Sequence, residues 1–423
     1  MSGLTTKNNA LYLDGVLLSD IAKDVGTPTY VYSAAAIRAQ YEALSGAMKR
    51  ALPADRQPLI CYAGKANGHL AILSLLRSLG SSIETVSEGE LLRALQAGFD
   101  PSKIVAEGVG KTRTEITAGL KAGVHQFNIE SLSELTRINE IAASLGKVAH
   151  IVFRLNPDIG GGGNDKITTG RKSDKFGMLL PRVIEGYELA RTLKNVKCVG
   201  LHTHIGSQIS SAEFFESLFQ KIVTVVKDLR QAGHEVSRLD IGGGFPIVYK
   251  DETLLDLDTY ANLVRDYIEP LGTQIILEPG RYMVGNAGFI LTEVLYVKQA
   301  EDRTFLILDA GMNDLVRPAM YSAYHDIQPV AHLERAAKTY DIAGPVCESS
   351  DIFGRERVLP AMEEGDIAVI KSAGAYGFCM ASNYNTRRLP AEVLVHDGKY
   401  SIIRQRQSYE DILGGEIVPD WIK

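Results

Sequence analysis

Hydrophobic and polar positions alternate along this chain in regular units from about residue 57 onward. Short apolar runs are followed by amphipathic stretches of helical period, as in residues 68–80, where Leu70, Leu73 and Leu76 share a face and Gly80 ends the pattern. The apolar runs predict eight strands, at residues 58–67, 81–87, 103–109, 125–131, 149–157, 195–207, 237–246 and 273–281. Eight strands alternating with helices predict parallel βα units, and eight is the number that closes a (β/α)8 barrel.

A doubly wound sheet is the alternative fold for such an alternation. It is disfavoured because no GxGxxG follows an early strand, and because polar motifs follow many of the predicted strands rather than marking one switch point.

The pattern changes after about residue 286, where strand-like runs follow one another without a strong helical period. The last of them, residues 391–406, contains Asp397-Gly398, a favoured pair for a type I′ hairpin turn. We therefore expect an α/β protein with a (β/α)8 barrel over residues 36–286 and a second, mostly antiparallel β domain over residues 287–423. The strand-like N-terminal segment 1–35 is expected to join the second domain.

A long, polar, glycine-rich segment at residues 156–177 interrupts the barrel pattern after the fifth predicted strand. Loops of this length in compact domains are usually functional or disordered. Because its position corresponds to the catalytic rim of a barrel, we favour a mobile lid over an inert loop.

The composition is that of a globular protein and argues against some classes of partner. A chain of 423 residues with 45% hydrophobic and 23% charged residues is typical of a globular protein of two domains. A net charge of -6 and the lack of a basic run argue against a nucleic-acid partner. No leader-like pattern and no membrane-length apolar run is apparent in the sequence. The four cysteines are far apart and form no CxxC, which favours a reducing cytoplasm.

Two motifs place a lysine and two histidines after predicted barrel strands. Lys65 stands in YAGKAN; alone it would be interpreted as a surface lysine, but a lysine in a barrel mouth can also bond covalently to a carbonyl cofactor. His202 and His204 stand in HTHIGS and share a strand face. A metal site would need further ligands, and none is apparent nearby in the sequence. The other interpretations are a hydrogen-bonded strand histidine, or a ring stacked on a planar ligand with Ser207 near an anion.

Two further motifs end the seventh and eighth predicted strands. Gly242, Gly243 and Gly244 allow backbone amides to approach an anion closely, and EPGR adds Glu278 and Arg281 around a Pro-Gly turn. Simple tight turns are the alternative. The loops after strands seven and eight of such barrels commonly bind a phosphate, which favours the phosphate interpretation. With Lys65, a histidine and a carboxylate, the set suits pyridoxal phosphate: the lysine for the aldehyde, amides and Ser207 for the phosphate, and Glu278 for the pyridine nitrogen.

The stretch GPVCESSD at residues 344–351 places Cys347 beside Glu348, with Asp351 close by. Acidic neighbours make a thiol a poor nucleophile. Packing, metal binding, nucleophilic attack and proton donation are the roles to distinguish.

Seven motifs in this order carry a resemblance over nearly the whole chain: YAGKAN, HTHIGSQ, DIGGGF, EPGR, RPAMY, CESSD and GAYGFCMASNYN. The chain resembles the fold type III, alanine-racemase-like pyridoxal phosphate enzymes, and within them the diaminopimelate decarboxylases. The resemblance implies decarboxylation of meso-2,6-diaminopimelate to L-lysine, with pyridoxal phosphate as cofactor and no metal. It also implies a homodimer in which the second domain delivers Cys347 and Glu348 to the partner's active site.

The resemblance also assigns roles to individual residues. Catalysis would rest on Lys65, which carries the cofactor, and on Cys347, which protonates the carbanion. Cofactor contacts would come from His204 against the ring, Glu278 at the pyridine nitrogen, and, around the phosphate, Ser207, Gly242, Gly243, Gly244, Gly280, Arg281 and Tyr376. Substrate contacts would come from Arg281, Arg317 and Tyr321 at the distal carboxylate, Glu348 at the distal ammonium, and Tyr376.

Other activities fit the motifs less well. Substrates of decarboxylases for ornithine, arginine or carboxy-polyamines lack a distal carboxylate, so the pocket would carry surplus positive charge. An alanine racemase pairs the ring nitrogen with arginine, and a non-catalytic regulator would have lost Lys65, Cys347 or the phosphate motif. Two positions depart from the family pattern: the glycine-rich loop lacks a common histidine, and Gly64 replaces a larger apolar residue.

Overall fold

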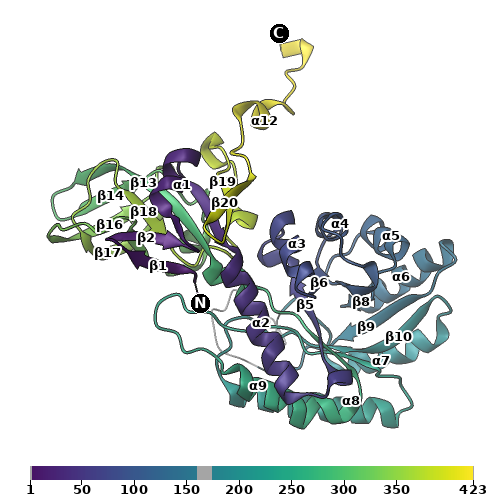
Figure 1. Ribbon diagram of the computed structural model, residues 1–423. Coiled ribbons are helices and arrows are strands. Elements are labelled where there is room, and N and C mark those ends of the chain that lie inside the picture. The colour runs from purple at the N-terminus through teal and green to yellow at the C-terminus, as the bar shows by residue number, and fades with distance from the viewer. Residues whose placement is uncertain (1, 160–173, 423) are drawn as a thin grey trace. The chain divides into compact units, whose positions relative to one another are not determined.

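A computed structural model describes residues 2–159 and 174–422 as two compact units (Figure 1). The barrel unit comprises Arg38–Ile247 and Thr253–Met283, and the β unit comprises Met1–Ile37, Val248–Glu252 and Val284–Lys423. The centre of the segment expected to form a lid, residues 160–173, lies outside the described residues.

Eight parallel strands close into a barrel in the first unit, in the order β10-β11-β12-β5-β6-β7-β8-β9. Their bounds are β5 Leu59–Ala63, β6 Ser82–Thr85, β7 Ile104–Ala106, β8 Gln126–Ile129, β9 Ala149–Arg154, β10 Val196–His202, β11 Arg238–Asp240 and β12 Gln274–Leu277. The strands are short and almost wholly buried, because a barrel strand is covered by side chains inside and by helices outside. The predicted α/β fold with a (β/α)8 barrel is confirmed.

Helices alternate with these strands: α3 Leu70–Ser78, α4 Glu88–Gln96, α5 Arg113–Ala122, α6 Leu132–Ser144, α7 Leu180–Thr192, α8 Ala212–Gln231 and α9 Leu257–Leu263. The local sequence determines where several of these helices begin. Ser87, Ser131 and Ser211 accept a hydrogen bond from the third residue of their helices, and Thr112 forms a full capping box with Glu115. Two further helices, α2 Ala34–Ala51 and α10 Arg281–Val284, flank the barrel segment in the sequence.

The β unit is built on a larger sheet, in the order β17-β16-β14-β13-β4-β19-β20, with β18 paired to β13 and β15. Its strands are β4 Thr29–Ser33, β13 Gly288–Gln299, β14 Thr304–Leu308, β15 Ile327–Pro329, β16 Ala337–Ala343, β17 Ile352–Pro360, β18 Ile367–Ile370, β19 Ala391–His396 and β20 Lys399–Arg404. The sheet is mostly antiparallel, as predicted, but β14–β16 and β4–β19 pair in parallel. The Asp397-Gly398 turn has positive φ at both residues, as a type I′ hairpin requires.

Strand β17 was not predicted from the sequence. It is an edge strand that carries Arg355, Glu356 and Arg357 in succession, so it lacks the apolar alternation that marks a half-buried strand.

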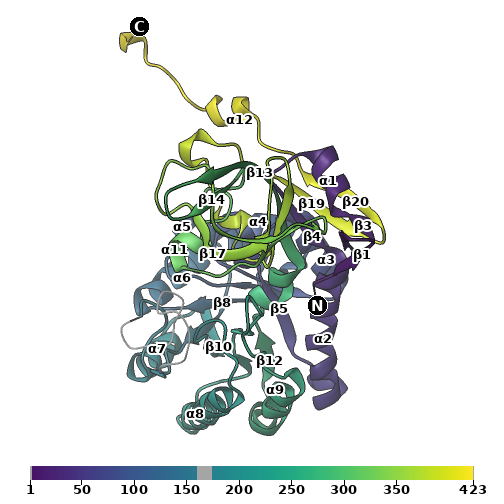
Figure 2. The ribbon, with the colours of Figure 1, turned by 90° about the vertical axis from the view of Figure 1, so that its left-hand side faces the viewer.

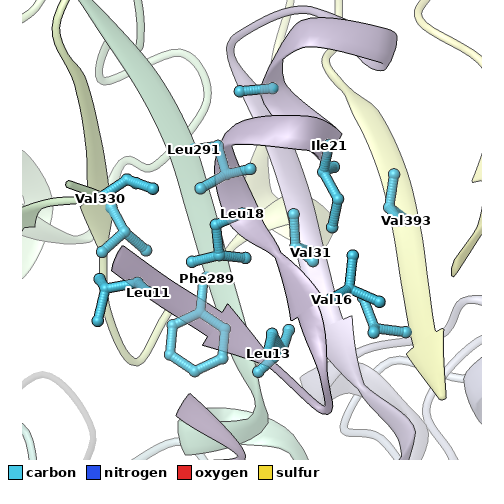
Figure 3. Close-up of a cluster of buried hydrophobic side chains, with 13 residues drawn as sticks. Leu11, Leu13, Val16, Leu18, Ile21, Val31, Phe289, Leu291, Val330 and Val393 are labelled. Carbon is cyan, nitrogen blue, oxygen red and sulfur yellow. The ribbon is translucent and has the colours of Figure 1, made fainter. Parts of the chain in front are cut away.

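The N-terminal segment of the chain covers one face of this sheet (Figure 3). The segment contains β1 Leu4–Lys7, β2 Ala10–Leu13, β3 Val16–Leu17 and α1 Leu18–Val25. Leu13, Leu18 and Ile21 are fully buried in one cluster with Phe289 and Leu291 of β13. Burial of each such side chain stabilises the fold by about 1.5–3 kcal/mol. Among the helices that the structure describes, none is long and apolar enough to cross a membrane.

Candidate active site

Lys65 lies in the 3₁₀ turn η2 (Gly64–Ala66), directly after β5. Its Nζ lies 2.9 Å and 3.0 Å from the two carboxylate oxygens of Glu84 and 3.8 Å from Oε2 of Glu107. Burial raises the pKa of the Glu84 carboxyl well above its usual value, and the charge of Lys65 acts in the opposite direction. The lysine amine is thus held over buried carboxylates at the C-terminal end of the barrel strands, where active sites of this fold lie.

Gly64, one departure from the family pattern, lies close to β6. A Cβ at this position would lie 3.2 Å from the carbonyl oxygen of Glu84 and 3.6 Å from Cδ1 of Ile83. A larger side chain would press on β6, the strand that carries the carboxylate of Glu84.

His204 lies beside the glycine segment that follows β11. The backbone N–H of Gly243 donates to Nδ1 of His204 over 3.2 Å. Burial, and then the charges of Lys65 and Arg154, hold the pKa of His204 well below its usual value. The ring is therefore neutral and carries its hydrogen on Nε2, which suits stacking against a planar ligand.

Three consecutive glycines, residues 242–244, form a segment called here the glycine cradle. A Cβ on any of them would press against neighbouring protein atoms. Gly242 and Gly244 have φ angles of 68° and 100°, in the region that favours glycine. A Cβ on Gly243 would lie 2.2 Å from the carbonyl oxygen of Glu278, so the two backbones approach as closely as glycine allows. The N–H of Gly242 donates to Oδ1 of Asp240 over 3.0 Å and that of Gly243 donates to His204, so what the segment offers an anion is a close approach to its backbone.

Glu278 is buried at the end of β12, where the sequence predicted a carboxylate. Its Oε1 accepts a 3.4 Å hydrogen bond from Nδ2 of Asn128, and its Oε2 lies 3.4 Å from Nε2 of His202. Burial, followed by the charge of Glu107, raises the pKa of Glu278 to about 8, although the charge of Lys65 acts in the opposite direction. A cationic ring nitrogen placed nearby would favour the ionised carboxylate.

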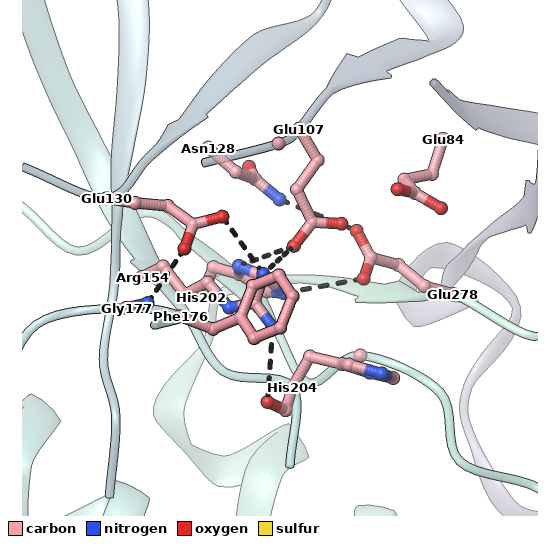
Figure 4. Close-up of polar contacts among 12 residues, drawn as sticks. Glu84, Glu107, Asn128, Glu130, Arg154, Phe176, Gly177, His202, His204 and Glu278 are labelled. Atoms are coloured by element: carbon pink, nitrogen blue, oxygen red, sulfur yellow. Dashed lines mark hydrogen bonds and ion pairs between the residues drawn. The ribbon is translucent and has the colours of Figure 1, made fainter. Parts of the chain in front are cut away.

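A buried ionic network beneath these residues was missed in the sequence (Figure 4). Arg154 Nη1 donates to Oε1 of Glu107 over 2.8 Å and to Oε1 of Glu130 over 3.0 Å. The backbone N–H of Gly177 donates to Oε2 of Glu130 over 2.7 Å, which ties the end of the glycine-rich segment to the barrel. The signal was available, because Glu107, Glu130 and Arg154 each lie at the C-terminal end of a predicted barrel strand.

This network contains carboxylates near His202 that could act as metal ligands and that the sequence did not reveal. Glu107, His202 and Glu278 each offer a ligand atom, and these atoms lie within 4.8 Å of one another, close enough to hold a metal ion. The cations of Arg154 and Lys65 already face Glu107, however, at 2.8 Å and 3.8 Å. We therefore interpret the group as part of an ionic network whose cations are Arg154 and Lys65.

Ser207 and Arg281 also meet at this end of the barrel. Nε of the buried Arg281 donates to Oγ of Ser207 over 3.2 Å. Gly280 precedes Arg281, the first residue of α10. The structure thus brings together the barrel residues that the sequence singled out.

In the β unit, Cys347 and Glu348 lie exposed on a tight turn. The turn is held by Asp351, whose carboxylate accepts hydrogen bonds from the backbone N–H groups of Met312 and Val346, both over 2.7 Å. The backbone N–H of Cys347 donates to Oδ1 of Asn385 over 2.8 Å. A hydrogen bond from Ser350 lowers the pKa of Glu348 and keeps it ionised. Asp351 therefore shapes the turn, and Cys347 and Glu348 are presented at its surface.

Arg317 is the first residue of α11 (Arg317–Tyr321), which also ends with Tyr321. His325 donates from Nδ1 to the carbonyl of Lys371 over 2.8 Å, so its Nε2 accepts from Nη1 of Arg317 over 2.9 Å. The guanidinium of Arg317 is buried and oriented by this contact. Tyr376 is half-buried and has a φ of 55°, a backbone conformation found at functional sites.

Comparison with known proteins identifies the family. Residues 36–285 match the model of the pyridoxal binding domain of the pyridoxal-dependent decarboxylases. The chain is 44% identical over 407 residues to the diaminopimelate decarboxylase of Neisseria meningitidis serogroup B, covering 96% of this chain and 97% of that one. This chain belongs to the diaminopimelate decarboxylase family.

Solved structures of the family have the same fold. The diaminopimelate decarboxylase of M. jannaschii, in complex with L-lysine, superposes with a TM-score of 0.95 at 36% identity, over 100% of both chains. That of Helicobacter pylori, also complexed with L-lysine, gives 0.89 at 39% identity, over 94% of this chain and 98% of that one.

The barrel residues fit the pyridoxal cofactor of this family. The fit rests on a lysine amine, a neutral imidazole, a buried carboxylate and a glycine segment whose backbone no side chain shields. These are the groups that an aldehyde, an aromatic ring, a ring nitrogen and a phosphate require.

Proposed function

We propose that this chain decarboxylates meso-2,6-diaminopimelate to L-lysine and carbon dioxide, the last step of lysine biosynthesis by the diaminopimelate route. It is a pyridoxal phosphate-dependent carboxy-lyase. The observation that carries the proposal is the meeting of Lys65, His204, Glu278 and the 242–244 cradle at the catalytic end of one barrel. In this proposal the barrel domain spans residues 36–286 and the β domain spans residues 287–423 with the N-terminal segment 1–35.

Lys65 would hold the aldehyde carbon of the cofactor, His204 would cover its ring, and Glu278 would keep its nitrogen protonated. The phosphate would lie among Ser207, Gly242, Gly243, Gly244, Gly280, Arg281 and Tyr376. Pyridoxal phosphate, when bound, supplies an electron sink for the pair left at Cα as carbon dioxide departs.

Residues of the β domain, with Arg281 of the barrel domain, recognise the distal end of the substrate, which is itself an amino acid. Arg317, oriented by His325, and Arg281 pair with the distal carboxylate, with Tyr321 beside them. Glu348 pairs with the distal ammonium, and its lowered pKa keeps it charged at neutral pH. Both charges are needed, because a buried zwitterion without partners would bind poorly.

Cys347 donates the proton that completes the reaction at Cα. A thiol holds its proton at neutral pH and can release it to a carbanion. The exposed position of the turn that carries Cys347 supports delivery to a second copy of the chain. We propose a homodimer in which Cys347 and Glu348 serve the partner's Lys65, and a cytoplasmic enzyme, since its cysteines are free thiols.

The test is release of carbon dioxide by the purified protein with pyridoxal phosphate. Meso-diaminopimelate, ornithine, arginine and lysine are offered separately, with Lys65→Ala as the inactive control. We expect turnover of diaminopimelate far above that of the other three substrates. Faster release from ornithine would disprove the substrate assignment, and equal release by Lys65→Ala would disprove the role of the lysine.

A further inference from the structure

The last residues of the chain form an exposed apolar tail, defined here as residues 414–422. It follows helix α12 (Tyr409–Leu413), whose start is fixed by a capping box between Ser408 and Asp411, and ends in the short turn η10 (Asp420–Ile422). Figures 1 and 2 show this tail running away from the sheets of the β unit. The side chains of Ile417 and Trp421 are 89% and 84% exposed.

Exposed apolar residues are ordinary when scattered but not when clustered. Val418 and Ile422 are also exposed, so four large apolar side chains face solvent within six residues. The same region is acidic: Glu410, Asp411, Glu416 and Asp420 lie within residues 408–422, which include no lysine or arginine. An apolar, acidic tail is suited to a basic surface with aromatic character.

The β unit has such a surface in a cavity of about 640 Å³. Its lining includes Lys250, Tyr324, Phe353, Arg355 and Arg357, and none of the described residues that line it is acidic. The guanidinium carbon of Arg357 lies 3.8 Å from the ring centroid of Tyr324, and Nζ of Lys250 lies 5.8 Å from it. Arg357 and Lys250 thus lie near one aromatic ring in the wall of this basic pocket, and Arg355 also faces the carboxylate of Asp341 at 3.3 Å.

We propose that the tail of a second copy of this chain docks in the basic pocket, with Trp421 against the arginines and Glu416 and Asp420 near the cations. The proposal rests on the homodimer proposed above and adds a second, reciprocal contact to it. The cavity volume is ample for an indole. An indole is also the strongest aromatic partner for a guanidinium. Because Trp421 is exposed in its own chain, it does not occupy the pocket of that chain.

Trp421 is the single tryptophan of the chain, so its fluorescence reports the tail alone. Emission and acrylamide quenching are measured on the holoenzyme over a dilution series, with sedimentation of the same samples. We expect blue-shifted emission and severalfold weaker quenching where the protein is dimeric, and both lost where it dissociates. Shielding that persists in the monomer would place the tail on its own chain and overturn the proposal.

A charge exchange tests the pocket itself. Arg355→Glu with Arg357→Glu is expected to expose Trp421 to quencher, and adding Glu416→Lys with Asp420→Lys is expected to restore its protection. Lys298→Glu, an exposed change on β13, is the control and leaves the fluorescence unchanged. An unaltered signal in the arginine variant would show that the tail docks elsewhere and overturn the assignment.

Two outcomes separate this inference from the function proposed above. A dimer in which Trp421 is quenched as freely as in the dissociated protein would overturn the docking and leave the homodimer standing. A protein that sediments as a monomer at all concentrations would overturn both the homodimer and the docking, whatever its decarboxylase activity.

Discussion

The ammonium of Lys65 lies within 3.0 Å of both carboxylate oxygens of Glu84. Glu84 is fully buried, whereas one third of the Lys65 side chain is exposed. A carboxylate in this position stabilises the charged form of the amine, but only the neutral amine attacks an aldehyde. We therefore expect Glu84, where Lys65 holds it ionised against the effect of burial, to keep the lysine charged and unreactive.

Replacing Glu84 with glutamine removes that charge and keeps the shape. We expect Glu84→Gln to bind pyridoxal phosphate at a lower pH than the unaltered protein, because Lys65 loses its proton more easily. The measurement is the visible absorbance of added cofactor across a pH series. Glu140→Gln, a surface change in α6, is the matched control, and equal pH profiles for all three proteins would contradict this role.

The glycine cradle should not tolerate a side chain. In Gly243→Ala the new methyl group would meet the carbonyl oxygen of Glu278, since the Cβ position is 2.2 Å away. We expect a loss of about 1–3 kcal/mol in the free energy of unfolding and weaker cofactor binding. Gly110→Ala, where nothing lies within 4 Å of the new Cβ, should change neither quantity. Urea unfolding and equilibrium dialysis measure the two effects, and cofactor affinity equal to that of Gly110→Ala would argue against the cradle.

Stability should depend on pH through Glu278. Its pKa in the folded, ligand-free protein is about 8, above the ordinary value for glutamate. Between these two values the folded state binds more protons than the unfolded state, so stability is highest at low pH and falls as pH rises toward 8. Urea unfolding of ligand-free protein from pH 5 to pH 8 should show this decline, and Glu278→Gln should make it shallower. An identical slope in the two proteins would show that Glu278 does not carry the shift.

The sequence was sufficient for the barrel because each strand is a local apolar run and most of the helices begin at a side-chain cap. It also singled out Lys65, His204 and Glu278 by distinctive motifs, and the structure has them near the ends of barrel strands, while their roles stay predictions. It did not reveal that Glu107, His202 and Arg154 meet, because their side chains come from separate strands and converge only when the barrel closes. Strand β17 was missed because it lacks apolar alternation, and the role of Asp351 was missed because one of its partners, Met312, lies far away in the sequence.

In the proposed homodimer, the lysine of one chain and the thiol of another form one active site. Lys65→Ala should be inactive, and Cys347→Ala should lose about 10²–10⁴-fold in kcat, as expected for removal of a general acid. The most direct measurement is carbon dioxide release from meso-diaminopimelate after the two variants are mixed and allowed to exchange subunits. We predict recovered turnover, because the hybrid dimer contains one site in which both Lys65 and Cys347 are intact. No recovery despite demonstrated exchange would contradict it.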